Sequence, residues 1–315
     1  AARRARPNGR GRGGAERPDG RERAAGISAR RGAWRGGAQR GTGPETVAVL
    51  KIMRLNAWGG RLHDRLIPYL TAAAPDVLCL QEVIRAPGPR RWLAYRDAER
   101  RLPQRSDLLA DVAVAPPSHA GVFAPSARGP LHEADGRQAE TLWGLATFVR
   151  MDLPVVEMRQ GFVHGAFRGD GFGPFPRPAN ALGMRLQPAA GRAVCVVQMH
   201  GLRDPRGKRH TPERTGQAER LAAMARELAR PGDARAVCGD FNVQPDSATF
   251  ATLAELGLRE LVVEGGFAGT RTSLYAKPRG GVADYMLVGE EVSPKGFEVV
   301  RDPEVSDHCP LLLEL

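Results

Sequence analysis

The sequence contains no long hydrophobic run: no stretch among its 315 residues reaches the roughly 20 apolar residues that a membrane-spanning helix requires. Residues 1–45 also lack the apolar core of about seven or more residues that a secretory signal would need. These two absences predict a protein with no membrane span and a cytoplasmic location.

Cysteine is scarce, and no two cysteines have the Cys-x-x-Cys spacing. The four are Cys79, Cys195, Cys238 and Cys309, and each lies in a short apolar run. Cysteines in such runs usually are reduced and pack as small hydrophobic side chains. Their pattern therefore agrees with a reducing compartment such as the cytoplasm.

Lysine is almost absent, with 4 residues against 42 arginines. Residues 1–45, which we call the leader, carry 12 arginines, 4 acidic residues and almost no aliphatic side chains. Such a segment cannot bury enough apolar surface to offset its loss of backbone entropy. Residues 46–315 hold 34 basic and 31 acidic residues, so most of the net charge of +11 comes from the leader.

We expect the leader to be disordered. An arginine-rich arm can bind nucleic acid by neutralising phosphates. However, the first methionine is Met53, inside the first predicted strand, and the arginine bias indicates a GC-rich coding sequence. Such DNA read upstream of a true start yields Arg, Gly, Ala and Pro, so we favour an unstructured or artefactual leader over a nucleic-acid arm. Residues 46–315 are predicted to form one α/β domain.

Short apolar runs rich in Val, Leu and Ile predict strands, and helical periodicity separates them. The predicted strands are 48–55, 76–81, 142–149, 193–199, 235–239, 282–288 and 309–315. The clearest helix has Thr211 as its N-cap and Pro212 in its first turn, and it ends before Pro231. Its apolar stripe consists of Leu221, Met224, Ala225 and Leu228. This stripe indicates that the helix serves packing rather than chemistry.

Polar side chains lie where these predicted strands end. They are Asn56, Glu82, His200, Asp240 with Asn242, Asp284, and Asp307 with His308. Ligands of α/β proteins usually bind at the ends of strands. Hydrolysis of a phosphate ester needs a cation, an activated water and donors for the developing charge, and strand-end carboxylates suit Mg²⁺ or Mn²⁺. The pattern therefore suggests metal-assisted phosphoryl hydrolysis.

In their order along the chain, these residues resemble the endonuclease/exonuclease/phosphatase superfamily. The superfamily includes deoxyribonuclease I, exonuclease III-like repair nucleases, inositol polyphosphate 5-phosphatases and bacterial sphingomyelinases. Each short motif alone is weak evidence, but six motifs in the superfamily's order are unlikely to occur by chance. The resemblance runs from about residue 47 to the end. It implies an α/β fold, a four-layer αββα sandwich of two mixed β-sheets flanked by helices.

The resemblance also implies a metal-dependent hydrolase with Mg²⁺ or Mn²⁺ as its cofactor. Glu82 is the expected metal ligand, Asn56 helps to hold the metal or the phosphate, and Asp307 is a second carboxylate on the metal side. Taken alone, Glu82 could be a surface acid at a strand terminus. Asn56 could equally be a turn residue that caps its strand.

By the same resemblance, Asp240 orients and deprotonates the attacking water, while Asn242 steadies the phosphoryl oxygens. Only Phe241 separates the two, so their side chains would leave the same face of an extended segment. The alternative is an ordinary Asx-turn that closes the strand before Pro245.

His308 is expected to donate to the phosphate, with Asp284 fixing its other ring nitrogen and favouring the imidazolium. His200 departs from the repair endonucleases, in which the corresponding strand usually ends in a Tyr followed by a Pro-Asn turn. A His here is more similar to deoxyribonuclease I, the sphingomyelinases and the inositol phosphatases. Abasic-site repair is therefore not the first interpretation.

Two loops are candidates for contacting the substrate. Residues 161–180 interleave aromatic residues with glycines and with basic residues such as Arg168. They could stack a base and hold a phosphate, or simply pack as a long loop. Residues 203–214 follow His200 and form either an anionic cradle or a solvated loop. The candidate basic residues there are Arg203, Arg206, Lys208 and Arg209.

Three functions stay open. The favoured one is a phosphodiesterase of nuclease type, because of the basic loops. The second is a lipid-headgroup or small-molecule phosphodiesterase or phosphatase, supported by His200 and by the near-neutral charge of residues 46–315. A catalytically inactive binding module is the weakest, since every expected acid is present. The expected partner is a phosphodiester substrate, with nucleic acid as one candidate, and no protein partner is predicted.

Overall fold

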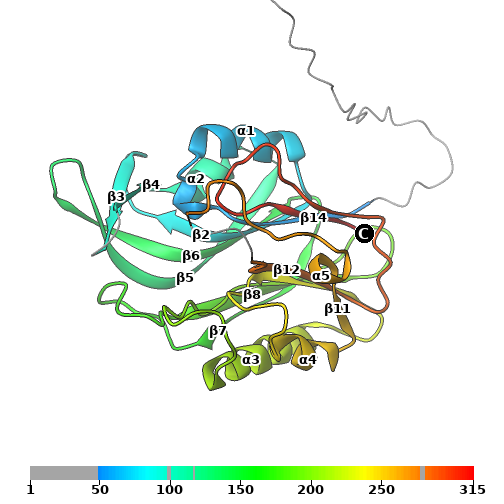
Figure 1. Cartoon of the computed structure of the whole chain (residues 1–315). Helices are drawn as coiled ribbons and strands as arrows, with labels where there is room; N and C mark the ends of the chain where they lie inside the picture. The colour runs from blue at the N-terminus through cyan, green and yellow to red at the C-terminus, as the bar shows by residue number, and fades with distance from the viewer. Residues whose placement is uncertain (1–48, 98–100, 116–117, 277–280) are drawn as a thin grey trace, which may run out of the picture. The chain divides into compact units, whose positions relative to one another are not determined.

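The computed structural model describes residues 49–97, 101–115, 118–276 and 281–315, so the leader lies outside the described residues. Two β-sheets face each other, and helices lie on the outer face of each (Figure 1). The covering helices are α1 (His63–Ala73) and α2 (Leu108–Ala113) on one sheet, and α3 (Pro212–Leu228) and α4 (Thr249–Ala254) on the other. The predicted four-layer αββα sandwich is confirmed.

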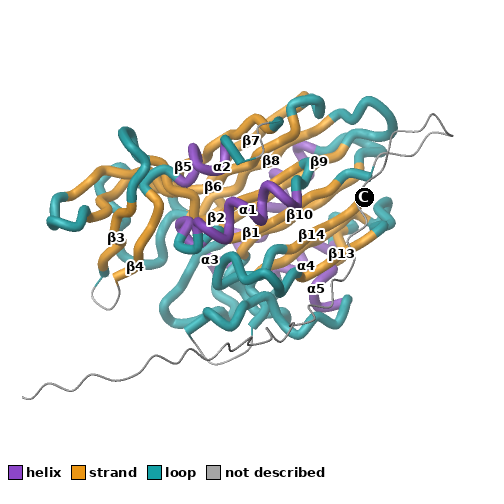
Figure 2. The backbone as a smooth tube through the Cα atoms, turned by 90° about the horizontal axis from the view of Figure 1, so that it is seen from above, coloured by secondary structure: helices purple, strands orange, loops and turns teal. Residues whose placement is uncertain are grey.

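The larger sheet has the strand order β13-β14-β1-β2-β6-β5-β3-β4, and the smaller sheet has the order β11-β12-β10-β9-β8-β7. Figure 2 shows β3 and β4 at one end of the larger sheet and β13 and β14 toward the other. The larger sheet consists of β13 (Gly296–Val299), β14 (Leu311–Glu314), β1 (Lys51–Asn56), β2 (Val77–Arg85), β6 (Gln138–Arg150), β5 (His119–His132), β3 (Trp92–Arg96) and β4 (Arg101–Arg105). The smaller sheet consists of β11 (Leu258–Glu260), β12 (Asp284–Gly289), β10 (Ala234–Asp240), β9 (Val194–His200), β8 (Ala179–Leu186) and β7 (Val155–His164). Two short helices, η1 (Trp58–Gly60) and α5 (Leu261–Glu264), lie in the connections.

Each sheet contains one parallel pair of strands flanked by antiparallel neighbours, namely β1 with β2 and β10 with β9. Asp240 ends β10, and its register partners are His200 at the end of β9 and Asp284 at the start of β12. Asn56 ends β1 opposite Gln81 of β2. The strand register therefore places most of the predicted polar residues at one edge of the sandwich.

All seven predicted strands are present, as β1, β2, β6, β9, β10, β12 and β14. The strands that the sequence pattern misses are β3, β4, β5, β7, β8, β11 and β13. β5 contains Pro125 and Pro130, which read as turn signals, and a bulge in fact lies between Pro125 and Ala127. β7 is mostly exposed, so it has no apolar run that would reveal it.

Strand β1 shows how the two cores are divided. Ile52 packs in the large cluster that includes the smaller sheet and α3, while Met53 and Leu55 pack with Leu66 and Leu70 of α1. Alternate side chains of a strand point to opposite faces. Arg54 lies on the same face as Ile52, toward the other sheet, and is fully buried.

Helix α3 is confirmed as a packing element. Thr211 is its N-cap, and the Thr211 side chain accepts a hydrogen bond from the backbone N–H of Arg214. Leu221, Ala225 and Leu228 of the predicted stripe are buried in the core. The four cysteines are also buried and carry free thiols. None of the described helices is both long enough and apolar enough to cross a membrane.

Gly239 immediately precedes Asp240 and is required by the close approach of β10 to β9. Its φ of +150° is rarely adopted by residues with side chains, and a Cβ atom there would lie 2.1 Å from the carbonyl oxygen of Met199. We predict that Gly239→Ala lowers the free energy of unfolding by at least about 2 kcal/mol, because backbone cannot yield as a flexible side chain does. Urea denaturation would measure the change.

Gly216→Ala is the matched control for this prediction. Gly216 lies inside α3, and a Cβ there would approach only the flexible side chain of Arg220. This substitution is expected to be neutral or to stabilise the protein by up to about 1 kcal/mol, because alanine favours helix. Equal losses in Gly239→Ala and Gly216→Ala would contradict the backbone contact as the cause.

Candidate active site

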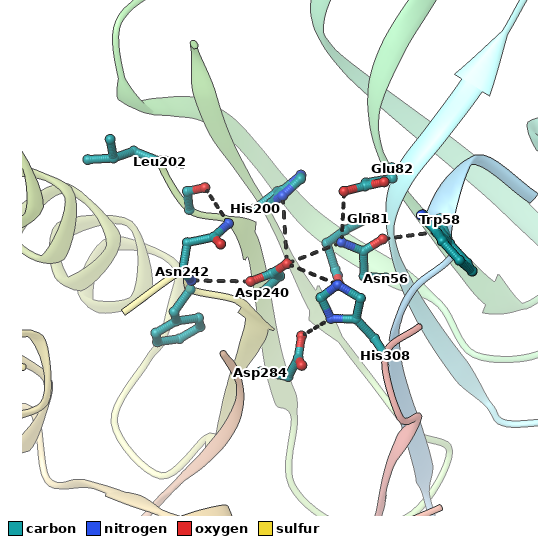
Figure 3. A network of polar contacts seen from close by, with 12 residues as sticks. Asn56, Trp58, Gln81, Glu82, His200, Leu202, Asp240, Asn242, Asp284 and His308 are labelled. Carbon is teal, nitrogen blue, oxygen red and sulfur yellow. Dashed lines mark hydrogen bonds and ion pairs between the residues drawn. The ribbon is translucent and has the colours of Figure 1, made fainter. Parts of the chain in front are cut away.

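A cavity of about 580 Å³ lies where the polar strand ends meet. Its lining includes six of the residues predicted for catalysis or metal binding: Glu82, His200, Asp240, Asn242, Asp307 and His308. Asn56 and Asp284 are fully buried and contact these lining residues (Figure 3). The structure thus brings together all eight residues predicted for catalysis or metal binding.

The carboxylate of Asp240 is the centre of this group. Its Oδ2 accepts a hydrogen bond from Asn56 Nδ2 at 3.1 Å and lies 3.6 Å from His308 Nε2 and 3.8 Å from His200 Nε2 (Figure 3). Burial and the nearby Asp284 would by themselves raise the pKa of Asp240. The imidazole of His308 and other cationic neighbours outweigh them, so the pKa of Asp240 lies below its ordinary value. Asp240 is therefore ionised at neutral pH.

Asn242 does not lie on an extended segment, and that expectation is wrong. Its φ is +54°, in the left-handed region that asparagine tolerates better than most residues. Its backbone N–H donates to Asp240 Oδ1 at 3.2 Å, which is an Asx-turn, and its Nδ2 donates to the carbonyl oxygen of Gly201 at 3.1 Å. The turn brings both Asp240 and Asn242 to the cavity wall.

Glu82 does not end its strand as predicted, because β2 continues to Arg85. The pairing of β2 with β6 shifts between Leu80 and Val83, so Glu82 lies on a bulge, with a φ of +55°. A bulge changes the direction of a side chain relative to the regular alternation of a strand. Here it directs the half-buried Glu82 carboxylate into the cavity.

Gln81, the other residue of the bulge, joins the two sheets. Its Nε2 donates to Gln198 Oε1 of β9 at 2.7 Å, and Gln198 in turn donates to the carbonyl oxygen of Ala146 in β6. Asn56 makes a second connection between the sheets, since its Nδ2 donates to Glu82 Oε1 and to Asp240 Oδ2, both at 3.1 Å. These amides hold the bulge and the catalytic edge together.

His308, Asp284 and Arg54 form a buried chain of polar contacts. His308 Nδ1 donates to Asp284 Oδ1 at 2.7 Å, Thr270 Oγ1 donates to Asp284 Oδ2 at 2.6 Å, and Arg54 Nη1 lies 2.5 Å from Asp284 Oδ1. Burial would raise the pKa of Asp284, but Arg54, His308 and Arg271 hold it well below its ordinary range. Arg54 lies inside the first strand, and no motif singled it out.

Arg271 is a further site residue that the sequence reasoning missed. Its Nη1 donates a hydrogen bond to His308 Nε2 and lies 3.6 Å from Asp307 Oδ2, and its Nη2 is 4.0 Å from Asp240 Oδ2. The guanidinium also lies over the ring of Tyr275 at 4.5 Å. An Nε2 atom that accepts from Arg271 cannot donate to a phosphate at the same time. A single arginine in a loop carries no motif that could have identified it.

His200 lies against an aromatic ring at the cavity wall. Its imidazole is 5.4 Å from the indole of Trp143, measured between ring centroids. Burial lowers the pKa of His200, and the neighbouring Asp240 and Glu82 oppose this effect only in part. His200 is therefore neutral near pH 7 and keeps one ring N–H as a donor.

The residues predicted to hold a divalent metal fit such an ion. Burial raises the pKa of Asp307, and the negative charge of Glu82 adds to this effect despite His308 and Arg271. Glu82 and Asp307 thus repel each other across the cavity edge, and both are hard oxygen donors. Asp240, Asp284 and His308 also offer ligand atoms within 4.8 Å of one another. Asp284 and His308, however, are already engaged by Arg54, Thr270 and Arg271, whereas Glu82 and Asp307 line the cavity.

The structure divides the predicted substrate-binding residues. Arg203 and Lys208 line the cavity. Arg168 lines a separate hollow and pairs with Asp170 at 2.9 Å, because it packs within its own loop. Arg206 pairs with Asp204 at 2.7 Å and points into solvent, and Arg209 is likewise exposed; neither lines the cavity. From the loop 161–180, Arg177 rather than Arg168 reaches the cavity, together with Phe172 and Phe175.

Comparison with known proteins concerns the family and the fold of the chain. A model of the endonuclease/exonuclease/phosphatase family matches residues 55–308. No curated protein sequence gives a significant match to the chain. The structure is similar to the mannosyl-6-phosphatase Bt3783 of Bacteroides thetaiotaomicron, with 15% identity and a TM-score of 0.59, over 84% of this chain and 99% of the other.

Two further solved structures share the fold. TDP2 of D. rerio complexed with a single-strand DNA product has 15% identity and a TM-score of 0.57, over 85% of this chain and 98% of the other. The human Nocturnin catalytic domain with a bound sulfate anion has 18% identity and a TM-score of 0.56, over 84% and 93%. At these identities the likeness concerns the fold, and the residues of the site carry the functional argument.

We predict that Arg54→Met lowers the free energy of unfolding by about 3–5 kcal/mol near neutral pH, because it leaves Asp284 buried without its partner. The folded-state pKa of Asp284 is depressed, so the contribution of the pair is fully present above the ordinary aspartate pKa of about 4 and is lost as the pH falls. The loss caused by Arg54→Met should therefore shrink toward about pH 3. Urea denaturation at both pH values measures it.

The control is Arg226→Met, at an exposed position in the last turn of α3. It should change the unfolding free energy by less than about 0.5 kcal/mol. If Arg54→Met cost the same at both pH values, the loss would come from packing and not from the ion pair.

Proposed function

The chain belongs to the endonuclease/exonuclease/phosphatase family of metal-dependent phosphoester hydrolases, and from this premise we propose that it is a phosphodiesterase of nuclease type. The proposed reaction is hydrolysis of a phosphodiester by a water molecule that Asp240 activates. One observation supports it above the others: at the edge of a cavity, a single oxygen of Asp240 accepts a hydrogen bond from Asn56 and lies within 3.8 Å of ring nitrogens of His200 and His308.

Asp240 is the proposed general base. Its Oδ1 accepts from the backbone of Asn242, which fixes the plane of the carboxylate and leaves Oδ2 toward the cavity. The water oxygen forms the new bond to phosphorus while its proton passes to Oδ2, and the ester oxygen leaves on the opposite side. Because the depressed pKa of Asp240 keeps it ionised, it is ready to accept this proton at neutral pH.

The remaining polar side chains stabilise the charge that develops on the phosphoryl oxygens. His200 has a ring N–H, and Asn242 has a second amide hydrogen beside the one it gives to Gly201. We propose that Arg271 turns from His308 toward the phosphate, which frees His308 Nε2 to donate as well. Asp284 keeps the His308 ring in this orientation through Nδ1.

We propose Mg²⁺, or Mn²⁺, as the cofactor, held by Glu82 and Asp307 with Asn56 beside them. When bound, the ion would neutralise phosphate charge and act as a Lewis acid. The raised pKa of Asp307 supports this assignment, because burial and Glu82 outweigh the effect of His308 and Arg271 on that carboxylate.

We predict that Asp240→Ala and His308→Ala each lower turnover of bis-p-nitrophenyl phosphate by about 10²-fold or more, since they remove the base and a donor to the transition state. Activity of the full chain should require Mg²⁺ or Mn²⁺ and vanish with chelator. Steady-state rates and far-UV circular dichroism together measure activity and folding.

Asp246→Ala is the control, because Asp246 is exposed in the loop after Asn242 and does not line the cavity. It should retain the rate of the unaltered chain. Near-normal activity in folded Asp240→Ala would show that the base lies elsewhere.

A small-molecule or lipid-headgroup phosphodiesterase or phosphatase is the second candidate. The volume of the cavity favours it, because about 580 Å³ is typical of a small-ligand site, and so does the near-neutral charge of residues 46–315. For a nuclease, binding should weaken by about 10-fold or more between roughly 50 and 200 mM salt, since several phosphates are neutralised. Fluorescence anisotropy with a labelled oligonucleotide measures this, and a flat response would favour the small substrate.

We propose the cytoplasm as the compartment. The buried free thiols of the four cysteines support the reducing compartment.

A further inference from the structure

We infer that Arg177 and Arg203 form a second anion site in the cavity, which binds a phosphate group of the substrate other than the one that is cleaved. The inference rests on the proposed function, because it takes the reacting phosphate to lie at Asp240 and His308. It narrows the substrate to a molecule that carries at least two phosphate groups.

The first reason is the lack of compensating charge. Several other partly buried arginines have carboxylate partners, such as Arg105 with Asp111 at 2.7 Å and Arg185 with Asp233 at 2.8 Å. Within the described ranges of the chain, no carboxylate lies within 4.0 Å of the guanidinium of Arg177 or Arg203. Both nevertheless line the cavity. Two unpaired cations on the wall of a cavity favour an anion from outside the protein.

The second reason is that the side chains are held in place without being neutralised. Arg177 lies 4.3 Å over the ring of Phe175, donates to Tyr95 Oη at 2.9 Å and donates to the carbonyl oxygen of Gly173 at 3.2 Å. Arg203 lies 5.2 Å over the same Phe175 ring. Stacking on an aromatic face orients a planar guanidinium and leaves its N–H groups free for a phosphate.

The third reason is that both guanidinium groups belong to one cluster. They come from different loops, after β7 and after β9, yet they share the ring of Phe175. Two like charges around one ring repel each other, and a phosphate bound by both would relieve this repulsion. Phe175 therefore acts as the platform of the proposed site, and we call Arg177, Arg203 and Phe175 the anion platform.

The anion platform is distinct from the reacting end of the cavity. There, Arg271 is accompanied by acids, with Asp307 at 3.6 Å and Asp240 at 4.0 Å. At the anion platform the positive charge has no such partner. The cavity thus has a mixed acidic and basic end for chemistry and a wall that Arg177 and Arg203 make basic, where the nearby Asp204 is already paired with Arg206 at 2.7 Å. A nucleic-acid strand and a polyphosphorylated small molecule both supply that group.

The test compares ligands that differ by one phosphate, with Asp240→Ala as the background so that nothing is consumed. The pairs are dithymidylate with its 5′-phosphorylated form, and inositol 1-phosphate with inositol 1,4-bisphosphate. Calorimetry in Mg²⁺ should show that the extra phosphate raises affinity by about 10-fold or more in at least one pair, as expected for charge-assisted hydrogen bonds. The pair that responds identifies the source of the second phosphate.

Arg203→Gln and Arg177→Gln, each added to Asp240→Ala, should abolish most of this gain. Arg203 is exposed, so its replacement should not disturb folding even if that of Arg177 does. The control Arg226→Gln removes the same charge from the outside of α3 and should keep the full gain. Equal affinities within both pairs, or a gain that persists in Arg203→Gln and Arg177→Gln, would overturn the second anion site.

The test of the second anion site and the test of the proposed function can fail independently of each other. If the chain with Asp240 intact cleaved no phosphoester, the proposed function would fail, while the binding comparison would still decide on the anion platform. If it cleaved bis-p-nitrophenyl phosphate but showed no gain in either ligand pair, only the second anion site would fall. With both in place, the control Arg226→Gln should leave cleavage of bis-p-nitrophenyl phosphate within about 2-fold of the unaltered rate, because Arg226 lies on the outside of α3 and does not line the cavity.

Discussion

The buried ion pair between Arg54 and Asp284 is the interaction on which the rest of the site depends. Arg54 comes from β1 of the larger sheet and Asp284 from β12 of the smaller one, and both are fully buried. Removing two charges from water is costly, and only close contact with additional hydrogen bonds offsets that cost. Asp284 obtains these bonds from Thr270 and from His308, whose contact with Asp284 is drawn in Figure 3. The two sheets are therefore held in the one relative position that also orients the His308 ring.

Acidic and basic side chains occupy different parts of the cavity. Glu82, Asp240 and Asp307 gather at the reacting end, where Arg271 lies 3.6 Å from Asp307 and 4.0 Å from Asp240 and balances only part of their charge. Arginines resting on aromatic rings occupy other parts of the lining: Arg61 on Trp58, and Arg177 and Arg203 on Phe175. An acidic end suits a divalent cation, and a basic wall suits the anionic remainder of a substrate.

Much of the fold and of the site could be predicted because strand ends carry local signals. An apolar run that stops at Asp240 or at His200 indicates a strand, and it also indicates that the polar side chain at its end lies at an edge of the sheet. The sequence pattern did not predict β5, because it contains prolines, or β7, because many of its residues are exposed. Arg54, Arg177 and Arg271 escaped for another reason: an arginine in a strand or a loop becomes a site residue only through neighbours that are distant in the chain.

By itself, the sequence determined the αββα class, the seven strands with strong apolar runs, and the set of acids, amides and histidines that chemistry would need. Tertiary structure alone decided how those groups face one another. The bulge that turns Glu82 into the cavity, the left-handed Asn242 and the contact of Arg271 with His308 all arise from packing between segments far apart in sequence. Local sequence encodes where a strand ends, whereas the direction of a charged side chain depends on the charges that folding brings near it.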